Sequence, residues 1–91
     1  MEQITIEGIV PESFRNQKEF YLRVSDHDIK KTAEFIAKTN TTFRSGSIAV
    51  RKQSIVSKCK AGDVIELTIG KQIRRDGIRL RIIEFKKIKS A

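Results

Sequence analysis

The chain has 91 residues, of which 38% are hydrophobic, a size that builds one domain (residues 1–91) around a single modest core. Its 19 Lys and Arg residues exceed its 11 Asp and Glu residues, and the resulting formal charge of +8 indicates an anionic partner. A single cysteine, Cys59, excludes an internal disulfide and is expected to be a small core residue; with one histidine it also excludes the usual four-ligand zinc site. The apolar runs are too short to cross a membrane and no signal peptide is recognisable, so we expect a cytoplasmic protein.

The first predicted strand runs from Ile4 to Val10, where residues alternate with the two-residue period of a half-buried strand. Ile4, Ile6 and Val10 are expected to face the core. Gly8 lies inside this strand, where a glycine permits a bulge or a sharp bend, as in a strand shared by two parts of a small barrel. Pro11 ends the strand.

The polar loop that follows carries one aromatic residue beside two cations, Phe14 with Arg15 and Lys18. An aromatic ring on a loop can stack on a base while neighbouring cations hold phosphates. The alternative is that Phe14 folds back over the end of the barrel as a lid.

The second predicted strand, Glu19 to Ser25, places three apolar residues on its core face and Tyr21 and Arg23 on the opposite face. Tyr21 is a candidate stacking platform and Arg23 a candidate phosphate contact. The alternative is an ordinary cross-strand surface pair. The core-facing residues are Phe20, Leu22 and Val24.

A helix is predicted from Asp26 to Thr39. Ser25 or Asp26 can cap its first backbone N–H groups, and acidic residues in its first turn match the helix dipole. Phe35 falls outside the apolar stripe of this helix and is expected to be exposed. The stripe consists of Ile29, Ala33, Ile36 and Ala37.

Phe43 and Arg44 repeat the combination of an aromatic residue and a cation in the loop after this helix. A short third strand is predicted from Ser47 to Lys52, with Arg51 on its outer face. One or two helical turns are expected between Gln53 and Lys60.

The last part of the chain predicts a hairpin. A strand from Val64 to Gly70 leads through a charged loop to Asp76-Gly77, a dipeptide that suits a tight turn, and to a second strand. Apolar residues at every second position of the second strand face the core, whereas Arg79 and Arg81 lie on the other face. The loop between the strands adds Lys71, Arg74 and Arg75.

The order of these elements resembles the oligonucleotide/oligosaccharide-binding (OB) fold family. The segments that carry the resemblance are ITIEGIV followed by KEFYLRVSD, and AGDVIELTIG followed by GIRLRIIEF. The resemblance implies a mainly β fold with one or two helices: a small five-stranded barrel, here with a helical insert between the second and third strands. It also implies nucleic-acid binding on the second and third strands and the loops beside them.

Among OB-fold proteins, the chain is similar to small single-stranded-DNA-binding proteins of phages and mobile elements. This similarity implies a largely sequence-independent role in DNA replication or recombination, with single-stranded DNA favoured over RNA, no cofactor and other replication proteins as further partners. An exposed edge strand makes a homodimer a further expectation. Arginines and lysines would neutralise phosphates and aromatic rings would stack on bases. The expected contact residues are Phe14, Arg15, Lys18, Tyr21, Arg23, Phe43, Arg44, Arg51, Lys71, Arg74, Arg75, Arg79 and Arg81.

Three alternatives remain open from the sequence. A winged-helix protein would read duplex DNA with a recognition helix between Val50 and Lys60 and a wing formed by the hairpin from Val64 to Phe85. An RNA-binding protein resembling a small bacterial translation initiation factor would share the OB fold. A small basic inhibitor of a host protein would carry a similar charged surface. An enzyme is not expected, because the carboxylates are scattered and no glycine-rich phosphate loop is present.

Overall fold

The computed structural model describes residues 2–12, 19–39, 41 and 43–91. Within this part the chain forms six strands and two helices, which confirms the prediction of a mainly β fold with one or two helices. The strand ladders are antiparallel and join in one open sheet with the order β3-β4-β2-β1-β5-β6. The elements are β1 (Gln3–Ile9), β2 (Phe20–Val24), α1 (Asp26–Ile36), β3 (Phe43–Arg44), β4 (Ser47–Val50), α2 (Gln53–Val56), β5 (Val64–Arg74) and β6 (Gly77–Lys89).

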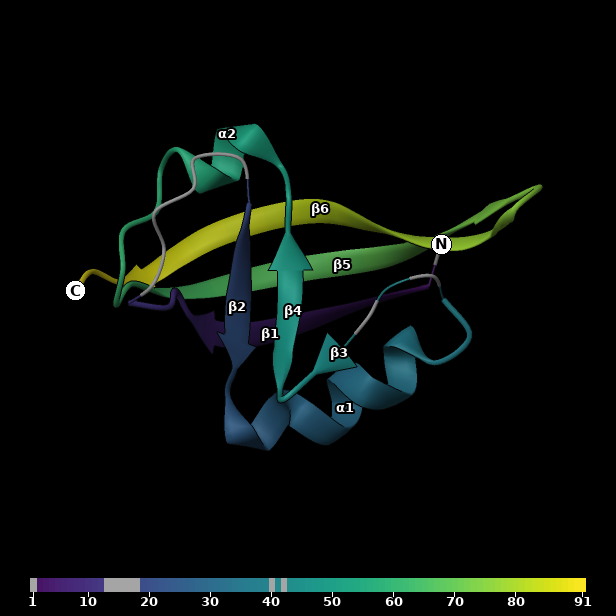
Figure 1. Cartoon of the computed structure of the whole chain (residues 1–91), viewed down its shortest axis with the longest axis horizontal. Helices are drawn as coiled ribbons and strands as arrows, with labels where there is room; N and C mark the ends of the chain where they lie inside the picture. Colours follow the sequence, from purple (N-terminus) through teal and green to yellow (C-terminus); the bar gives the residue numbers. More distant parts are fainter. Residues whose placement is uncertain (1, 13–18, 40, 42) are drawn as a thin grey trace.

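The sheet is divided into long strands and short strands that cross them. Strands β1, β5 and β6 run side by side, and β2 and β4 cross them (Figure 1). β1 pairs with β5 along its whole length, from Gln3 opposite Gly70 to Ile9 opposite Val64. It pairs with β2 only near its own end, at Gly8 and Ile9. The end of β1 is therefore the corner at which the sheet changes direction.

Gly8 makes this corner possible. A Cβ atom at this position would lie 2.6 Å from Leu22 Cγ and 2.7 Å from the backbone oxygen of Arg23, closer than real Cβ contacts. Only a residue without a side chain allows β2 to approach β1 this closely. This agrees with the bend that the glycine predicts for the first strand.

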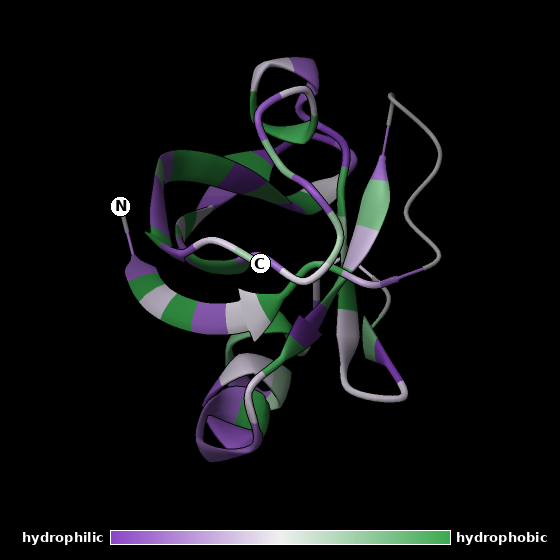
Figure 2. Cartoon of the chain, turned by 90° about the vertical axis from the view of Figure 1, so that its left-hand side faces the viewer, coloured by the Kyte–Doolittle hydropathy of each residue, from purple (hydrophilic) through white to green (hydrophobic). Residues whose placement is uncertain are grey.

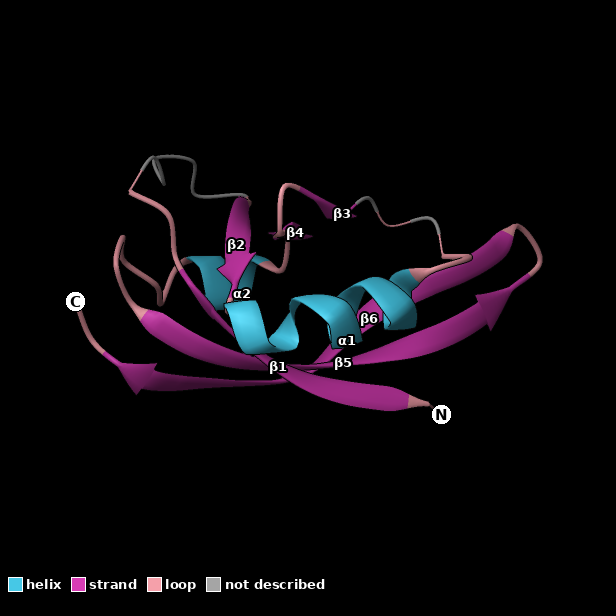
Figure 3. Cartoon of the chain, turned by 90° about the horizontal axis from the view of Figure 1, so that it is seen from below, coloured by secondary structure: helices cyan, strands magenta, loops and turns pink. Residues whose placement is uncertain are grey.

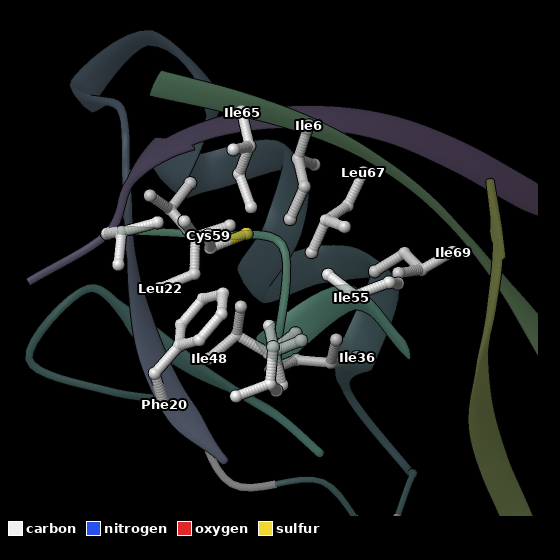
Figure 4. Packing of buried hydrophobic residues seen from close by; sticks show 14 of the residues in the cluster. Ile6, Phe20, Leu22, Ile36, Ile48, Ile55, Cys59, Ile65, Leu67 and Ile69 are labelled. Carbon is white, nitrogen blue, oxygen red and sulfur yellow. The ribbon is translucent and has the colours of Figure 1, made fainter. Parts of the chain in front are cut away.

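The core lies inside this folded sheet and is built from alternate positions of the strands. Hydrophobic and hydrophilic residues form alternating bands along the strand ribbons (Figure 2). Side chains from the crossing strands and from the long strands point toward one another, with Ile55 of α2 and Cys59 among them (Figure 4). The free thiol of Cys59 is buried, as expected. α2 itself is shorter than the predicted segment from Gln53 to Lys60.

Helix α1 buries a different face from the one that hydrophobicity predicts. Of the expected stripe, Ile36 is buried and Ile29 is half-buried and packs against the core, whereas Ala33 and Ala37 are exposed. Phe35 is 6% exposed and belongs to the core, so the prediction of an exposed Phe35 is wrong. The buried face also contains two polar residues, Asp28 and Thr32, and it is their inclusion that rotates the helix away from the expected stripe. The helix begins at Asp26 as predicted, but it ends at Ile36 rather than at Thr39.

Asp28 can be buried because polar groups surround its carboxylate. The backbone N–H of Glu7 donates to Oδ2 over 2.9 Å, and Lys31 Nζ lies 3.2 Å from Oδ1. Burial raises the pKa of Asp28, but the hydrogen bonds from Glu7 and Lys31 and the nearby His27 outweigh it and hold the pKa below its ordinary value. Asp28 thereby fixes α1 against β1. Neither described helix has the length and the apolar run that a transmembrane span needs.

The segment from Phe43 to Gly46, predicted as a loop, begins with the short strand β3. Arg44 pairs with Ser47 of β4, so that Ser45 and Gly46 alone connect the two strands. Both have positive φ, 53° and 74°, as the mirror-image turns of tight hairpins require.

The β5–β6 hairpin is longer than predicted. Lys71 and Arg74, expected in the connecting loop, lie in β5, and the ladder continues to Arg74 opposite Gly77. The turn therefore consists of Arg75 and Asp76, one residue earlier than the predicted Asp76-Gly77, and Gly77 has a φ of 130°. The tip of this hairpin extends beyond α1 and the other strands (Figures 1 and 3).

Candidate nucleic-acid interface

A groove of about 1150 Å³ lies between β4 and β6, and we call it the edge groove. These two strands are far apart in the sheet order, and no ladder joins β6 to β3 or β4 in the described residues. The sheet curls so that they face each other, and a single parallel bridge joins Thr39 to Ile78. The groove is lined by Tyr21, Thr41, Arg44, Ser45, Ser47, Ile48, Ala49, Val50, Arg51, Lys52, Leu67, Ile69, Arg79, Leu80, Arg81 and Ile82.

The lining combines apolar side chains with cations from separate parts of the chain. Most of its apolar residues are inward-facing positions of β4, β5 and β6, which belong to the core or pack against it, whereas Ala49 lies on the outer face of β4. The cations come from the β3–β4 side and from β6 on the opposite side. The half-buried side chains of Leu80 and Ile82 offer apolar surface for flat rings between two sources of positive charge. The cations are Arg44, Arg51, Lys52, Arg79 and Arg81.

Tyr21 contributes the aromatic ring of this groove. It lies on the outer face of β2, directly opposite Ala49 of β4, and is 53% exposed. The second and third predicted strands, β2 and β4, therefore lie side by side in the sheet. Because the neighbour across the ladder is a small alanine, the face of the tyrosine ring is not covered from that side. Arg23 is also exposed and stands opposite Ser47, but it does not line the groove.

Two of the groove arginines have acidic partners. Arg51 Nε lies 3.0 Å from Glu19 Oε2. Arg79 donates a hydrogen bond to Asp76, and this bond holds the pKa of the Asp76 carboxyl below its ordinary value. Both arginines are more than half exposed, so water and salt screen these pairs and the arginines can exchange their partners for phosphates.

Other predicted contact residues lie outside the edge groove. Phe43 is half-buried and packs against the core. Lys71 has a side chain only 20% exposed, with Nζ 4.6 Å from the centre of the Phe35 ring and 3.6 Å from Glu2 Oε1. It stabilises the body of the protein rather than presenting a free charge. Arg74 and Arg75 lie at the exposed tip of the hairpin, and three predicted contacts fall outside the described residues: Phe14, Arg15 and Lys18.

The structure adds groove residues that sequence patterns did not single out. Lys52 follows Arg51 and extends the positive charge along the β4 side. Thr41, Ser45 and Ser47 supply polar groups on the same side. Lys52 could have been included as the neighbour of a predicted contact. The three hydroxyl residues carry no pattern of their own, because it is the curling of the sheet that brings them to the groove.

The chain matches no protein-family model, no curated protein and no solved structure. Its function therefore has to be inferred from the fold and from the residues of the edge groove.

Proposed function

We propose that this protein binds single-stranded nucleic acid, DNA in preference to RNA, without catalysing a reaction, and that the edge groove is its binding site. The observation that carries the proposal is the composition of the groove. Cations line both sides of an apolar surface, and the exposed ring of Tyr21 lies beside them. Phosphates, flat bases and a flexible backbone are the features that such a surface recognises.

The strand order supports membership of the OB-fold family. In the series β4-β2-β1-β5-β6, the first strand pairs on one side with the second and on the other with the first strand of the last hairpin. This is the arrangement expected of a five-stranded, partly open barrel that has its gap between β4 and β6. β3 would then be an addition to the barrel, and α1 the helical insert between its second and third strands. Proteins of this kind bind nucleic acid on the face of the strands that correspond to β2 and β4.

A single strand fits this groove better than a duplex. The arginines would neutralise phosphates and release counterions, which both kinds of DNA permit. Only unpaired bases, however, can stack on Tyr21 or lie against the apolar residues of the groove, since a duplex hides its bases in its own stack. Neither contact reads hydrogen-bonding edges, so little sequence preference is expected. Such a binder would serve DNA replication or recombination.

The apolar surface also favours DNA over RNA. Leu80 and Ile82 offer no hydrogen-bonding side-chain groups, and a ribose 2′-hydroxyl placed against them would lose its hydrogen bonds to water. A deoxyribose has no such group to desolvate. We therefore expect DNA to bind more tightly than RNA of the same sequence.

Fluorescence anisotropy across a salt series tests the proposal. Labelled single-stranded DNA should bind more tightly than duplex DNA or RNA of the same length. Replacing Tyr21 with Ala should weaken binding by about 1–3 kcal/mol, the contribution of one stacked base. The thermal midpoint of this variant should stay that of the wild type, because the ring is exposed.

A charge-matched pair of variants locates the site. The double variant Arg44→Gln/Arg81→Gln removes one cation from each side of the edge groove. It should reduce the slope of log K against log salt by about 0.7 for each arginine that contacts a phosphate. The control Lys30→Gln/Lys58→Gln removes the same charge from exposed residues outside the groove and should change the slope little. Equal losses in both variants, or stronger binding of the duplex, would refute the proposal.

The alternatives make different predictions in these experiments. A winged helix needs a recognition helix, but Val50 lies in β4 and α2 has only four residues, too few to fill a major groove. The RNA-binding alternative predicts that RNA binds more tightly than DNA of the same sequence, the opposite of the result expected here. Absence of binding to any nucleic acid at low salt would favour an inhibitor of an acidic protein.

A further inference from the structure

The tip of the β5–β6 hairpin projects from the body of the protein, and we call it the hairpin arm (residues 72–79). The ladder between β1 and β5 ends at Gly70, and the N–H of Lys71 still donates to the carbonyl oxygen of Glu2; from Gln72 onward β5 pairs only with β6. From Ile73 to Asp76 every residue is exposed. The arm therefore extends into solvent from the end of the edge groove, where Arg79 belongs to both (Figures 1 and 3).

One face of the arm carries positive charge. Gln72 pairs with Arg79, and Arg74 pairs with Gly77, so that Arg74 and Arg79 are diagonal neighbours on the same face of the ladder. Arg81 lies two residues further along the same face of β6 and lines the edge groove. A continuous row of arginines thus leads from the groove toward the tip, with Arg75 in the turn.

The opposite face of the arm carries an exposed apolar side chain. Ile73 pairs with Ile78 across the ladder. Ile78 is half-buried and forms the bridge to Thr39, whereas Ile73 is 84% exposed, more than any other large hydrophobic side chain of the described residues. A single exposed isoleucine is ordinary on a protein surface. This one stands on a projecting ribbon with arginines on its other face, a combination found where apolar side chains insert against bases.

We propose that the hairpin arm recognises the junction between single-stranded and duplex DNA, with Ile73 packed on the last base pair. This inference rests on the proposed function, since it requires that the edge groove hold the single strand. The strand would continue from the groove along the row of arginines. The duplex end would then lie against the other face of the arm. A wedge inside an intact duplex must separate stacked bases, at considerable cost. At a junction the outer face of the last base pair is already open, and covering it only removes apolar surface from water.

The test compares two labelled DNAs that share the same single strand. One is the strand alone, and the other carries a closed duplex hairpin at one end. The wild-type protein should bind the junction about five- to tenfold more tightly than the strand alone, the effect of covering about half of one aliphatic side chain. Ile73→Thr should abolish this ratio and leave binding of the single strand unchanged. Threonine is β-branched and fits a strand, so the arm is retained.

A matched control and a local probe make the result specific. Ile83→Thr changes the same residue type at an exposed position of β6 outside the arm, and the junction ratio should remain that of the wild type. 2-Aminopurine in the last base pair should change its fluorescence with the wild-type protein but not with Ile73→Thr. The inference is overturned if the wild-type protein binds both DNAs equally, or if Ile73→Thr weakens binding of the single strand as much as of the junction. Failure to bind either DNA would instead overturn the proposed function.

Discussion

The two ends of the β5–β6 hairpin are alike in sequence and opposite in environment. Ile65, Leu67 and Ile69 alternate along β5 and are completely or almost completely buried. Ile73 continues a similar alternation on the same strand and is exposed. Alternation therefore determines on which face of a strand a side chain lies, but burial depends on whether another part of the chain covers that face.

The difference in burial arises from the strands and the helix that pack against each end of the hairpin. Along the body end, β1 pairs with β5, and the crossing strands and α2 cover its inner face. In the hairpin arm β5 pairs only with β6, with the bridge from Ile78 to Thr39 at its base, and an isolated two-stranded ribbon is marginally stable in water. We expect the arm to open locally at a much smaller free energy than the body. Changes in the arm should therefore alter binding, and changes in the body should alter stability.

The largest effect on stability is expected from shortening a buried side chain in the part of the hairpin that belongs to the body. Leu67→Ala removes a fully buried side chain and should lower the free energy of unfolding by about 2–5 kcal/mol. The equivalent truncation of the arm, Ile73→Ala, should change it by less than about 0.5 kcal/mol. Urea denaturation followed by circular dichroism measures both. A similar loss in the two variants would show that the arm is part of the cooperative body.

A smaller, pH-dependent effect is expected from Asp63, the buried carboxylate at the start of the body end. The backbone N–H groups of Ala91 and Lys60 donate to its two oxygens, each over 2.9 Å, and Lys87 Nζ lies 3.2 Å from Oδ2. The two N–H groups hold the pKa of Asp63 below its ordinary value of 3.8, burial opposes them, and Lys87 adds to them. Asp63→Asn leaves only one oxygen for two donors and should lower the free energy of unfolding by about 1–3 kcal/mol at neutral pH.

The sign of the pH dependence follows from the lowered pKa. Stabilisation by a carboxylate with a lowered pKa is complete above the unfolded value near 3.8 and is lost as the pH falls through the folded value. The difference in stability between the wild type and Asp63→Asn should therefore be constant above about pH 5 and shrink below pH 3.8. Urea denaturation at a series of pH values measures this difference. A difference that stays constant down to pH 2 would contradict the assigned role.

Most of the strands could be predicted because each carries its own alternation. β2 and β4 lie within one or two residues of their predicted limits, and the outward positions of Tyr21 and Arg23 follow directly from the pattern. Only the β5 side of the arm was predicted as a loop, whereas Ile78 and Arg79 were predicted in the second strand. Lys71 to Arg74 contain three polar residues, and such a segment is typical of a loop unless a partner strand is known to pair with it.

Neither the buried face of α1 nor the edge groove could be predicted, because both depend on contacts between distant segments of the chain. Asp28 and Thr32 are polar, and only the hydrogen bonds from Glu7 to Asp28 and from Thr32 to the Asp28 carbonyl allow them to face the core. The groove depends on β4 and β6 meeting as the sheet curls at Gly8. No local pattern records such an approach between distant segments. Sequence reasoning could identify four of the five lining cations, all but Lys52, but not that they face each other.

The smallest effect on stability, and a gain in binding, is expected from Asp76 at the tip of the arm. Its carboxylate is exposed and accepts a hydrogen bond from Arg79. Asn is well suited to a tight turn, so Asp76→Asn should leave the thermal midpoint unchanged. The substitution removes the only acidic residue of the arm and frees Arg79 for a phosphate. Single-stranded DNA should bind a few-fold more tightly at low salt, and the slope of log K against log salt should steepen by up to about 0.7. Unchanged binding, with the edge-groove variants still impaired, would show that the nucleic acid follows the groove but does not reach the arm.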